Sequence, residues 1–345
     1  MDPIRVGVVG VGHLGCEHAR IYASLPDVEL VGVSDLDWSR ASAVGKRVGV
    51  RPYSDHSELL ESADAVSVAV PTVDHHALVR EALLAGAHVL VEKPITKTIA
   101  EAEELVRLAQ SRGLVLQVGH VERYNPAVQA MVGRVSRPLF IECHRLSPFG
   151  NRGTDVSVVL DVMIHDLDIV LGMVESPVVG IDAIGIPVLS PLEDIANARI
   201  EFEGGCIANL TASRVSAEKL RKIRIFQHDS YMSVDYVAQK VKLYRRVQDE
   251  AGPRVVQEDV DVAADEPLRM ELISFVESIR EGKRPLVSGW DGKRALEVAL
   301  RIVDVIRDRR QAMIDKIATD GDKWHIPREK GEYISGGPGE RCEQG

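Results

Sequence analysis

The segment VGVVGVGHLG, residues 6–15, restricts most strongly what this chain can fold into. An apolar run over residues 4–9 is followed by Gly10, Gly12 and Gly15, and a helical pattern begins at once. Glycines at this spacing permit a tight turn and let the backbone approach a diphosphate, which the free N–H groups of the helix would bind. Asp35 closes the second apolar run about 20 residues later, where a carboxylate holds ribose hydroxyls. We therefore predict a dinucleotide site formed by Gly10, Gly12, His13, Leu14 and Asp35.

The charge near Asp35 selects between the two common dinucleotides. An acid at this position repels the 2′-phosphate of NADP, and no arginine follows it before Arg40. NAD is therefore the predicted cofactor. In the simpler alternative, the glycines only make a sharp turn and Asp35 only caps the segment that follows.

The order of segments predicts an α/β fold with a doubly wound parallel sheet in its first part. Apolar runs alternate with helical patterns as far as Gly119, which is typical of βαβ units. Gly113 ends the last of these helical patterns, in the position that a helix C-cap favours. We assign a Rossmann domain to residues 1–123. The predicted strands are residues 4–9, 29–34, 65–70, 88–92 and 114–119, and the predicted helices are residues 17–25, 75–86 and 99–113.

From Tyr124 onward the pattern changes. A helical segment at residues 158–174 precedes several short runs in which apolar and polar residues alternate, so we predict an α+β domain with a large, mostly antiparallel sheet over residues 124–312. Two later helices carry apolar faces, and the polar tail at residues 313–345 is expected to be partly disordered. The two faces consist of Leu268, Leu272, Val276 and Ile279, and of Leu296, Ala299, Leu300 and Val303.

Charge and cysteine content exclude several classes of protein. The net charge is −10 and the basic residues form no single stripe, so no nucleic-acid partner is expected. Neither a bilayer-length apolar run nor a signal-like segment is present, and we expect a soluble cytoplasmic protein without a membrane partner. Cys16, Cys143, Cys206 and Cys342 lack metal-ligand spacing, so neither a metal site nor a disulfide framework is expected.

A charged pair stands where a buried strand ends, in the segment VLVEKPITKT at residues 89–98. Ligands of open parallel sheets bind beyond the carboxyl ends of the strands, and Glu92 and Lys93 lie at such an end. Pro94 stops the strand, so Lys93 is directed toward the cofactor crevice, where its ammonium could stabilise a developing alkoxide. The alternative is a lysine that extends into solvent beside Glu92.

A second polar cluster lies on the predicted helix at residues 158–174. Asp161, His165 and Asp168 share one helical face, and Asp166 points elsewhere. A histidine oriented by a carboxylate can accept the proton of an alcohol. An ordinary helix with a polar edge is the alternative. The opposite face, which includes Val159, Val162, Val170 and Leu171, is expected to pack on the sheet.

Five motifs together resemble the glucose-fructose oxidoreductase / inositol dehydrogenase / MocA (Gfo/Idh/MocA) family: GVVGVGHLG, PTVDH, AGAHVLVEKPIT, RYNP and LDVMIHDLD. The resemblance implies that Lys93 and His165 are the catalytic pair, with Asp161 as their companion. It leaves open which of the pair accepts the proton. It also implies cofactor contacts by Pro71, Thr72, His75, Glu92 and Lys93, and a homodimer or homotetramer formed through the second sheet.

The segments at residues 119–128 and 145–171 look like those of family members that oxidise the 3-hydroxyl of UDP-N-acetylglucosamine for lipid A or surface-polysaccharide synthesis. On this resemblance a sugar or nucleotide-sugar substrate is expected. Another sugar or inositol, a redox-neutral NAD-dependent glycosidase or lyase, and a non-catalytic NAD-binding protein remain alternatives. The expected substrate contacts are Arg123, Tyr124, Arg145, Arg152, Asp155, Asp161 and His165; the arginines and the tyrosine would equally serve at a surface or between domains.

Overall fold

The computed structural model describes residues 2–150, 156–249 and 252–319. Residues up to Ile306 belong to one compact unit, and residues from Arg307 onward belong to a second. Cys342 and the predicted tail from residue 320 lie outside the described residues. Within the described ranges, no helix combines the length and the apolar character that crossing a membrane requires.

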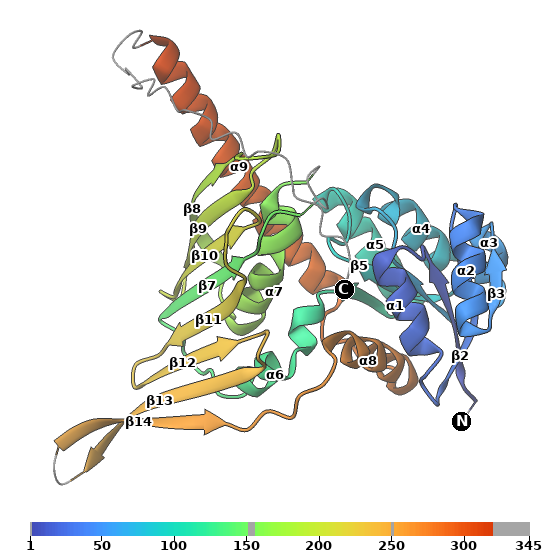
Figure 1. Ribbon diagram of the computed structural model, residues 1–345, viewed down its shortest axis with the longest axis horizontal. Helices are drawn as coiled ribbons and strands as arrows, with labels where there is room; N and C mark the ends of the chain where they lie inside the picture. The colour runs from blue at the N-terminus through green and yellow to red at the C-terminus, as the bar shows by residue number, and fades with distance from the viewer. Residues whose placement is uncertain (1, 151–155, 250–251, 320–345) are drawn as a thin grey trace, which may run out of the picture. The chain divides into compact units, whose positions relative to one another are not determined.

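The first sheet is parallel throughout and has the order β3-β2-β1-β4-β5-β6 (Figure 1). Its central strands are buried on both faces because helices cover both sides, which explains their continuous apolar runs. The strands are β1 (Ile4–Val9), β2 (Val28–Ser34), β3 (Arg51–Tyr53), β4 (Ala65–Val68), β5 (His88–Glu92) and β6 (Leu116–Gly119).

Helices connect these strands and begin at their carboxyl ends. Asp37 and Asp55 cap two of the helices, and Gly113 ends a third in the left-handed conformation, as predicted. These helices are α1 (His13–Tyr22), α2 (Trp38–Val48), α3 (His56–Leu60), α4 (Thr72–Ala85) and α5 (Ile99–Arg112). A 3₁₀ helix, η1 (Val121–Tyr124), and the short helix α6 (Pro126–Val132) follow β6.

The second sheet has the order β14-β13-β12-β11-β7-β10-β9-β8, in which only the β10–β7 pair is parallel among the described strands. One face is apolar and buried, and the other is polar and partly exposed, so the residues alternate along each strand. The strands are β7 (Phe140–Leu146), β8 (Val178–Ile186), β9 (Ile195–Phe202), β10 (Ile207–Ser213), β11 (Leu220–Phe226), β12 (Ser230–Asp235), β13 (Lys240–Asp249) and β14 (Gly252–Val260).

Helical segments pack on the apolar face of the second sheet. A π-helical turn, η2 (Val159–Met163), continues into α7 (Ile164–Met173), and Val159, Val170 and Leu171 enter the same core as the strands. The predicted apolar face of this helix is therefore confirmed. The part of α9 (Gly289–Thr319) up to Ile306 adds Leu296 and Ala299 to the buried core. The helix runs past the boundary that we predicted at residue 312.

Residues of α8 (Pro267–Glu281) and the segment after it complete the core of the first sheet. Leu272, Phe275 and Val276 of α8 are buried with β1 and α1. Val287 lies in the core around β5, and its carbonyl accepts a hydrogen bond from Val118 of β6 at 3.0 Å. The fold class predicted from sequence is confirmed. The division between residues 123 and 124 stays a prediction, because both sheets belong to one compact unit.

Candidate active site

The glycine-rich loop joins β1 to α1 and can be built only with glycine at two positions. Gly10 has a φ of 83°, and a Cβ there would lie 2.7 Å from the carbonyl oxygen of Ala69. A Cβ on Gly15 would lie 1.8 Å from the carbonyl oxygen of Gly10. The backbone N–H of Val11 donates to Asp35 Oδ2 at 2.9 Å, so the acid at the end of β2 lies directly against the loop.

A cavity of about 620 Å³ opens beside this loop, and we call it the Asp35 cavity. Gly10, Gly12, Asp35, Arg40 and Pro71 are among the residues that line it. Its glycines leave room for a bound diphosphate, and its carboxylate is in position for ribose hydroxyls, so the residues fit NAD. Arg40 Nη1 lies 3.4 Å from both oxygens of Asp35.

Lys93 leaves the end of β5 and reaches the η2–α7 helix. Its Nζ donates to the main-chain oxygen of Asp161 at 2.7 Å and to Asp161 Oδ1 at 2.9 Å. The Lys93 side chain is 15% exposed, and the Lys93–Pro94 peptide bond is cis. The lysine therefore does not extend freely into solvent, and the alternative raised for it is not what the structure shows.

Asp161 lies in the π-helical turn and offers Lys93 two hydrogen-bond acceptors, its main-chain oxygen and its carboxylate. π turns widen the helix and loosen its hydrogen-bond pattern, and they are frequent at functional sites. Here the turn contains Asp161 and ends one residue before α7, which carries His165. The predicted orienting role of Asp161 is not seen, because its carboxylate bonds Lys93 and not His165. Asp168 Oδ1 lies 3.5 Å from Arg123 Nη1, and its Oδ2 has no hydrogen-bond partner among the described residues.

His165 lies near Lys93 in a half-buried, positively charged setting. Burial, Lys93 and Arg145 hold the pKa of His165 well below its usual range. Its Nδ1 is buried and has no hydrogen-bond partner among the described residues. The ring of His120, at the end of β6, lies edge-on at 6.2 Å, and burial lowers the pKa of His120 to about 3. His165 is therefore neutral at neutral pH and able to accept a proton.

Lys93 and His165 face a shared cavity of about 580 Å³, the Lys93 cavity. It lies between the ends of the first sheet and the second sheet, and Leu14 and Glu92 line it too. Lys219, Arg221, Tyr236 and Gln239 are also among its lining residues. Sequence reasoning missed these four residues. The alternation of polar and apolar residues along β11 is the one signal that could have placed Arg221 on the inner face.

The remaining predicted cofactor residues hold the loops in place. His75 is buried, and its two ring nitrogens lie 2.9 Å from the carbonyl oxygens of Val70 and Pro94. It therefore ties the end of β4 to the turn that carries Lys93. Thr72 begins α4, and His13 begins α1 with its side chain exposed. Neither of these two lines the cavities described above.

The structure does not bring Arg123, Tyr124 and Arg145 to the lining of the Lys93 cavity. Arg145 donates to Asp166 through Nε and Nη2 and to Glu122 through Nη1, which occupies all three of its nitrogens. Arg123 Nη1 donates to the carbonyl oxygen of Asp168. Tyr124 is 4% exposed and lies in the core around β5. Their predicted substrate contacts are thus unsupported by their surroundings, because buried carboxylates and the core already hold them. Arg152 and Asp155 lie outside the described residues.

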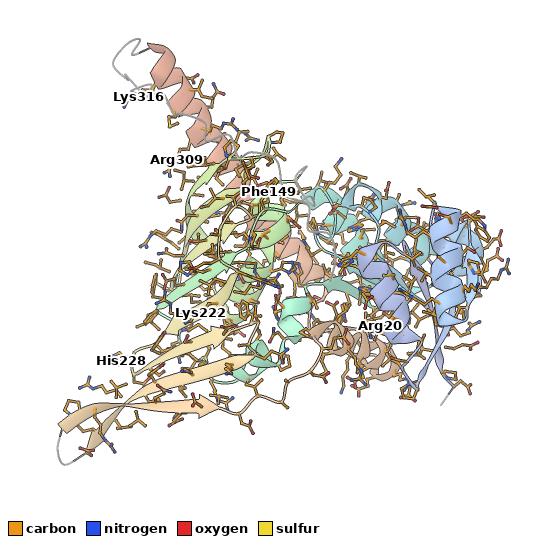
Figure 2. The ribbon with its side chains drawn as sticks, in the orientation of Figure 1. Arg20, Phe149, Lys222, His228, Arg309 and Lys316 are labelled. Carbon is orange, nitrogen blue, oxygen red and sulfur yellow. The ribbon has the colours of Figure 1, made fainter. Side chains whose placement is uncertain are left out.

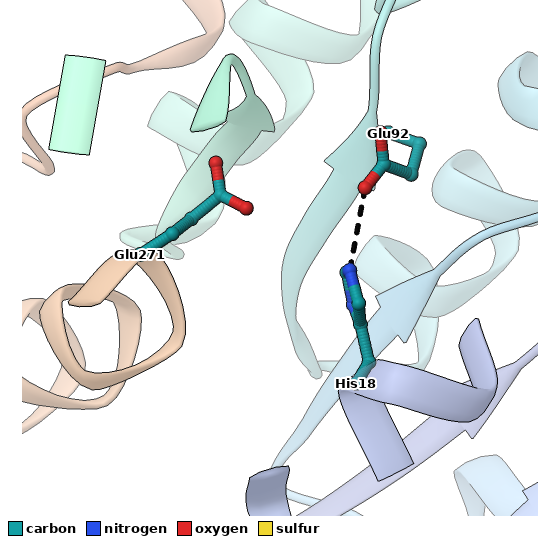
Figure 3. Close-up of side chains that lie close together, drawn as sticks. All are labelled: His18, Glu92 and Glu271. Atoms are coloured by element: carbon teal, nitrogen blue, oxygen red, sulfur yellow. Dashed lines mark ion pairs between the residues drawn. The ribbon is translucent and has the colours of Figure 1, made fainter. Parts of the chain in front are cut away.

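Behind Glu92 lies a buried cluster of three titratable groups, shown in Figure 3. Glu92 Oε1 is 3.3 Å from His18 Nε2 on α1, and the carboxyl group of Glu271 on α8 lies close by. Neither oxygen of Glu271 has a hydrogen-bond partner among the described residues. Burial, followed by Glu92 and Asp168, raises the pKa of Glu271 well above its usual range. Burial therefore favours the neutral, protonated form of Glu271.

Comparison with known proteins agrees with this geometry. Residues 4–120 match an oxidoreductase family with an NAD-binding Rossmann fold, and residues 127–229 match the GFO/IDH/MocA C-terminal domain. The chain is 38% identical over 305 residues to UDP-N-acetylglucosamine 3-dehydrogenase of Acidithiobacillus ferrooxidans. This match covers 88% of this chain and 97% of that protein. It is 26% identical over 333 residues to scyllo-inositol 2-dehydrogenase (NAD(+)) of Bacillus subtilis. This match covers 90% of this chain and 96% of that protein.

Solved structures give the same picture. A structure of UDP-N-acetylglucosamine 3-dehydrogenase from Acidithiobacillus ferrooxidans superposes with a TM-score of 0.84 at 37% identity, covering 89% of this chain and 98% of that one. Levoglucosan dehydrogenase in complex with NADH superposes with a TM-score of 0.80 at 17% identity, covering 89% of this chain and 98% of that one. The second match supports the fold alone.

Proposed function

Since the chain belongs to the Gfo/Idh/MocA family of NAD-binding oxidoreductases, we propose that it oxidises the 3-hydroxyl of UDP-N-acetylglucosamine to a ketone. The observation that carries this proposal is the meeting of Lys93 and His165 in one cavity, at the carboxyl end of the parallel sheet. The 38% identity to a UDP-N-acetylglucosamine 3-dehydrogenase over 97% of its length supports the substrate.

The proposed mechanism uses the charges of the cavity as they stand. His165 is neutral and accepts the proton of the sugar hydroxyl, because burial and Lys93 disfavour its protonated form in the resting site. The ammonium of Lys93 stabilises the developing alkoxide. NAD, when bound, supplies the hydride acceptor. Asp161 fixes the direction of the Lys93 side chain through its two oxygens.

A 3-keto sugar nucleotide is a substrate for amino transfer. We propose that the product feeds the synthesis of an amino sugar for lipid A or a surface polysaccharide. Conversion of the free, untrapped ketone to a 3-amino sugar nucleotide by a transaminase with an amino donor would support this placement.

The test of the reaction combines purified protein, NAD and UDP-N-acetylglucosamine with a hydrazine that traps the ketone. The trap is needed because oxidation of an alcohol by NAD is uphill. We expect NADH and trapped ketone in equal amounts, and both should fall by roughly a hundredfold or more in Lys93→Met and His165→Asn. NAD binding without NADH on this substrate would overturn the substrate assignment. Normal turnover by both variants would overturn the site assignment.

The inositol dehydrogenase among the relatives gives the proposal a specific rival. The same pair, Lys93 and His165, could oxidise a cyclitol hydroxyl by the same steps. Parallel assays with inositols and free sugars separate the two, because a cyclitol enzyme would have the higher kcat/KM on those compounds. Product formation without net NADH would instead indicate a redox-neutral glycosidase or lyase.

A further inference from the structure

The lining of the Lys93 cavity includes two cations whose role the proposed reaction does not explain. Lys219 precedes β11 and Arg221 is the second residue of that strand, and both line the cavity with Lys93 and His165. Residues two apart on a strand point to the same face. Arg221 pairs in register with Arg145 of β7, which is buried on the inner face of the sheet. Arg221 is thus directed into the site, and Lys219, just before the strand, lines the same cavity.

We propose that Lys219 and Arg221 bind the diphosphate of the nucleotide-sugar substrate. This inference rests on the proposed function, and it names residues other than Arg123 and Arg145, which were expected from the sequence to contact the substrate. A diphosphate carries two negative charges. An arginine offers it a planar fork of N–H donors, and a lysine adds a flexible point charge.

The ion pairs around the cavity decide which cations are free for such a ligand. Glu122 Oε1 accepts from Arg145 Nη1 at 2.8 Å and from Arg221 Nη1 at 3.3 Å. Arg145 is buried and its nitrogens are occupied, whereas the Arg221 side chain is 41% exposed and makes no second side-chain bond within the described residues. Lys219 is exposed and forms no ion pair with any described residue. Two cations therefore face the cavity with hydrogen-bonding capacity left.

The acids that line the cavity do not cancel this charge. Glu266 is bound to Arg20 of α1 at 2.5 Å, and Glu122 is shared by two arginines. Glu92 Oε1 lies 3.3 Å from His18 Nε2. The cavity therefore combines its reacting groups, Lys93 and His165, with two uncommitted positive charges. A sugar held by Lys93 and His165 with its diphosphate toward β11 matches this distribution.

The experiment measures UDP binding by calorimetry in the presence of saturating NADH, so that the dinucleotide site is occupied and UDP binds at the substrate site. The variants are Lys219→Ala, Arg221→Ala and Arg221→Lys. Lys222→Ala is the matched control, because Lys222 is the next residue of β11, labelled in Figure 2, and alternation directs it to the opposite face. The Arg221→Lys variant preserves the charge beside Glu122 if Arg221→Ala fails to fold.

We expect the Kd of UDP and the KM of UDP-N-acetylglucosamine to rise roughly tenfold or more in each alanine variant, which corresponds to the loss of one charge-assisted contact. Arg221→Lys should show an intermediate rise, since it keeps the charge and loses the fork. Lys222→Ala should match the unmodified protein. The salt dependence of UDP binding should also weaken in both alanine variants.

Unchanged UDP affinity in Lys219→Ala and Arg221→Ala would overturn the inference while leaving the dehydrogenase proposal intact. If the unmodified protein bound no UDP and oxidised only a non-nucleotide sugar or an inositol, both the diphosphate site and the proposed substrate would be wrong. NADH affinity, measured in the same variants, shows that each still folds.

Discussion

At the scale of single residues, two hydrogen bonds fix the position of the Lys93 ammonium. One residue, Asp161, supplies both of its acceptors, and one of these is a main-chain oxygen that no substitution removes. Asp161→Asn therefore leaves the lysine partly oriented but removes the carboxylate charge. We expect kcat/KM to fall about tenfold, well short of the loss in Lys93→Met.

Steady-state kinetics with the true substrate checks this prediction. Asp259→Asn on the outer strand β14 is the control, since it removes the same charge far along the second sheet. A loss in Asp161→Asn as large as that in Lys93→Met would instead indicate that the carboxylate itself takes part in proton transfer.

His120 makes the stability of the fold sensitive to acid. Its pKa is about 3 in the folded protein and about 6.5 when unfolded, so the unfolded chain binds more protons between these values. The free energy of unfolding should therefore fall as pH decreases below about 6.5, by up to about 1.4 kcal/mol per pH unit for this group. Urea unfolding from neutral to acidic pH, compared with His120→Gln, measures this contribution. Identical pH slopes in the two proteins would contradict the assignment.

Glu271 is expected to act in the opposite direction. Its pKa is raised in the folded state, so the unfolded chain loses the proton first as pH rises above about 4.3. The stabilisation by the neutral acid is then lost progressively toward high pH. Glu271→Gln should stabilise the protein relative to the parent chain, and increasingly so from mildly acidic to mildly alkaline pH. Glu277→Gln, exposed on the same helix, should have no such effect.

At the scale of elements, the start of α5 anchors the turn that carries Lys93. The Thr98 side chain accepts from the N–H of Glu101, and the Glu101 carboxylate accepts from the N–H of Thr98, which forms a capping box. Thr98→Ala should lower the free energy of unfolding by about 1 kcal/mol. Lys97→Ala at the exposed neighbouring position should leave it unchanged. Chemical denaturation measures the free energy of unfolding of both variants. Equal values for Thr98→Ala and Lys97→Ala would rule out a contribution from the cap.

The elements also show where sequence information was sufficient. The strands at 4–9 and 88–92 and the helix at 99–113 could be predicted because buried runs, glycine stops and capping residues agree locally. No prediction covered α2, β3 and α3. The strand β3 has three residues, too few to display a period, and in α2 only Ala41, Val44 and Gly45 are buried.

The candidate site divides in the same way. Lys93 and His165 could be identified because their motifs place them at a strand end and on a helix face. The sequence could not show which side chains form ion pairs with one another. Arg145 is held by Glu122 and Asp166, both more than twenty positions away, and only the folded chain brings them together. Similarly, the β7–β11 register decides that Arg221 faces the cavity.

At the scale of the whole molecule, the outer face of the second sheet carries a ladder of stacked aromatic rings. Phe140, Phe226, Tyr231 and Tyr244 follow one another across four strands, with ring centroids 5.6, 4.8 and 5.1 Å apart. All four are partly exposed. We propose that this face joins copies of the chain into a homodimer or homotetramer, as stacked aromatic surfaces favour.

Light scattering on the eluting protein tests the oligomer. We expect a mass of two or four chains, and a shift toward one chain in Tyr231→Asp, whose new charge would be buried at the interface. Lys242→Ala, exposed on β13, is the control for a change at a neighbouring strand. A single-chain mass for the unmodified protein would contradict the proposal.

The contribution of α8 to the first sheet has a consequence during translation. The NAD-binding half is encoded first, yet Leu272, Phe275 and Val287 complete its core from the far end of the chain. While the ribosome is still synthesising the second sheet, the surfaces that receive these side chains have no partner and stay exposed to chaperones and proteases. A protein truncated after residue 123 would expose the same surfaces permanently, so the cofactor-binding half should be recoverable only from chains that include α8 and the start of α9.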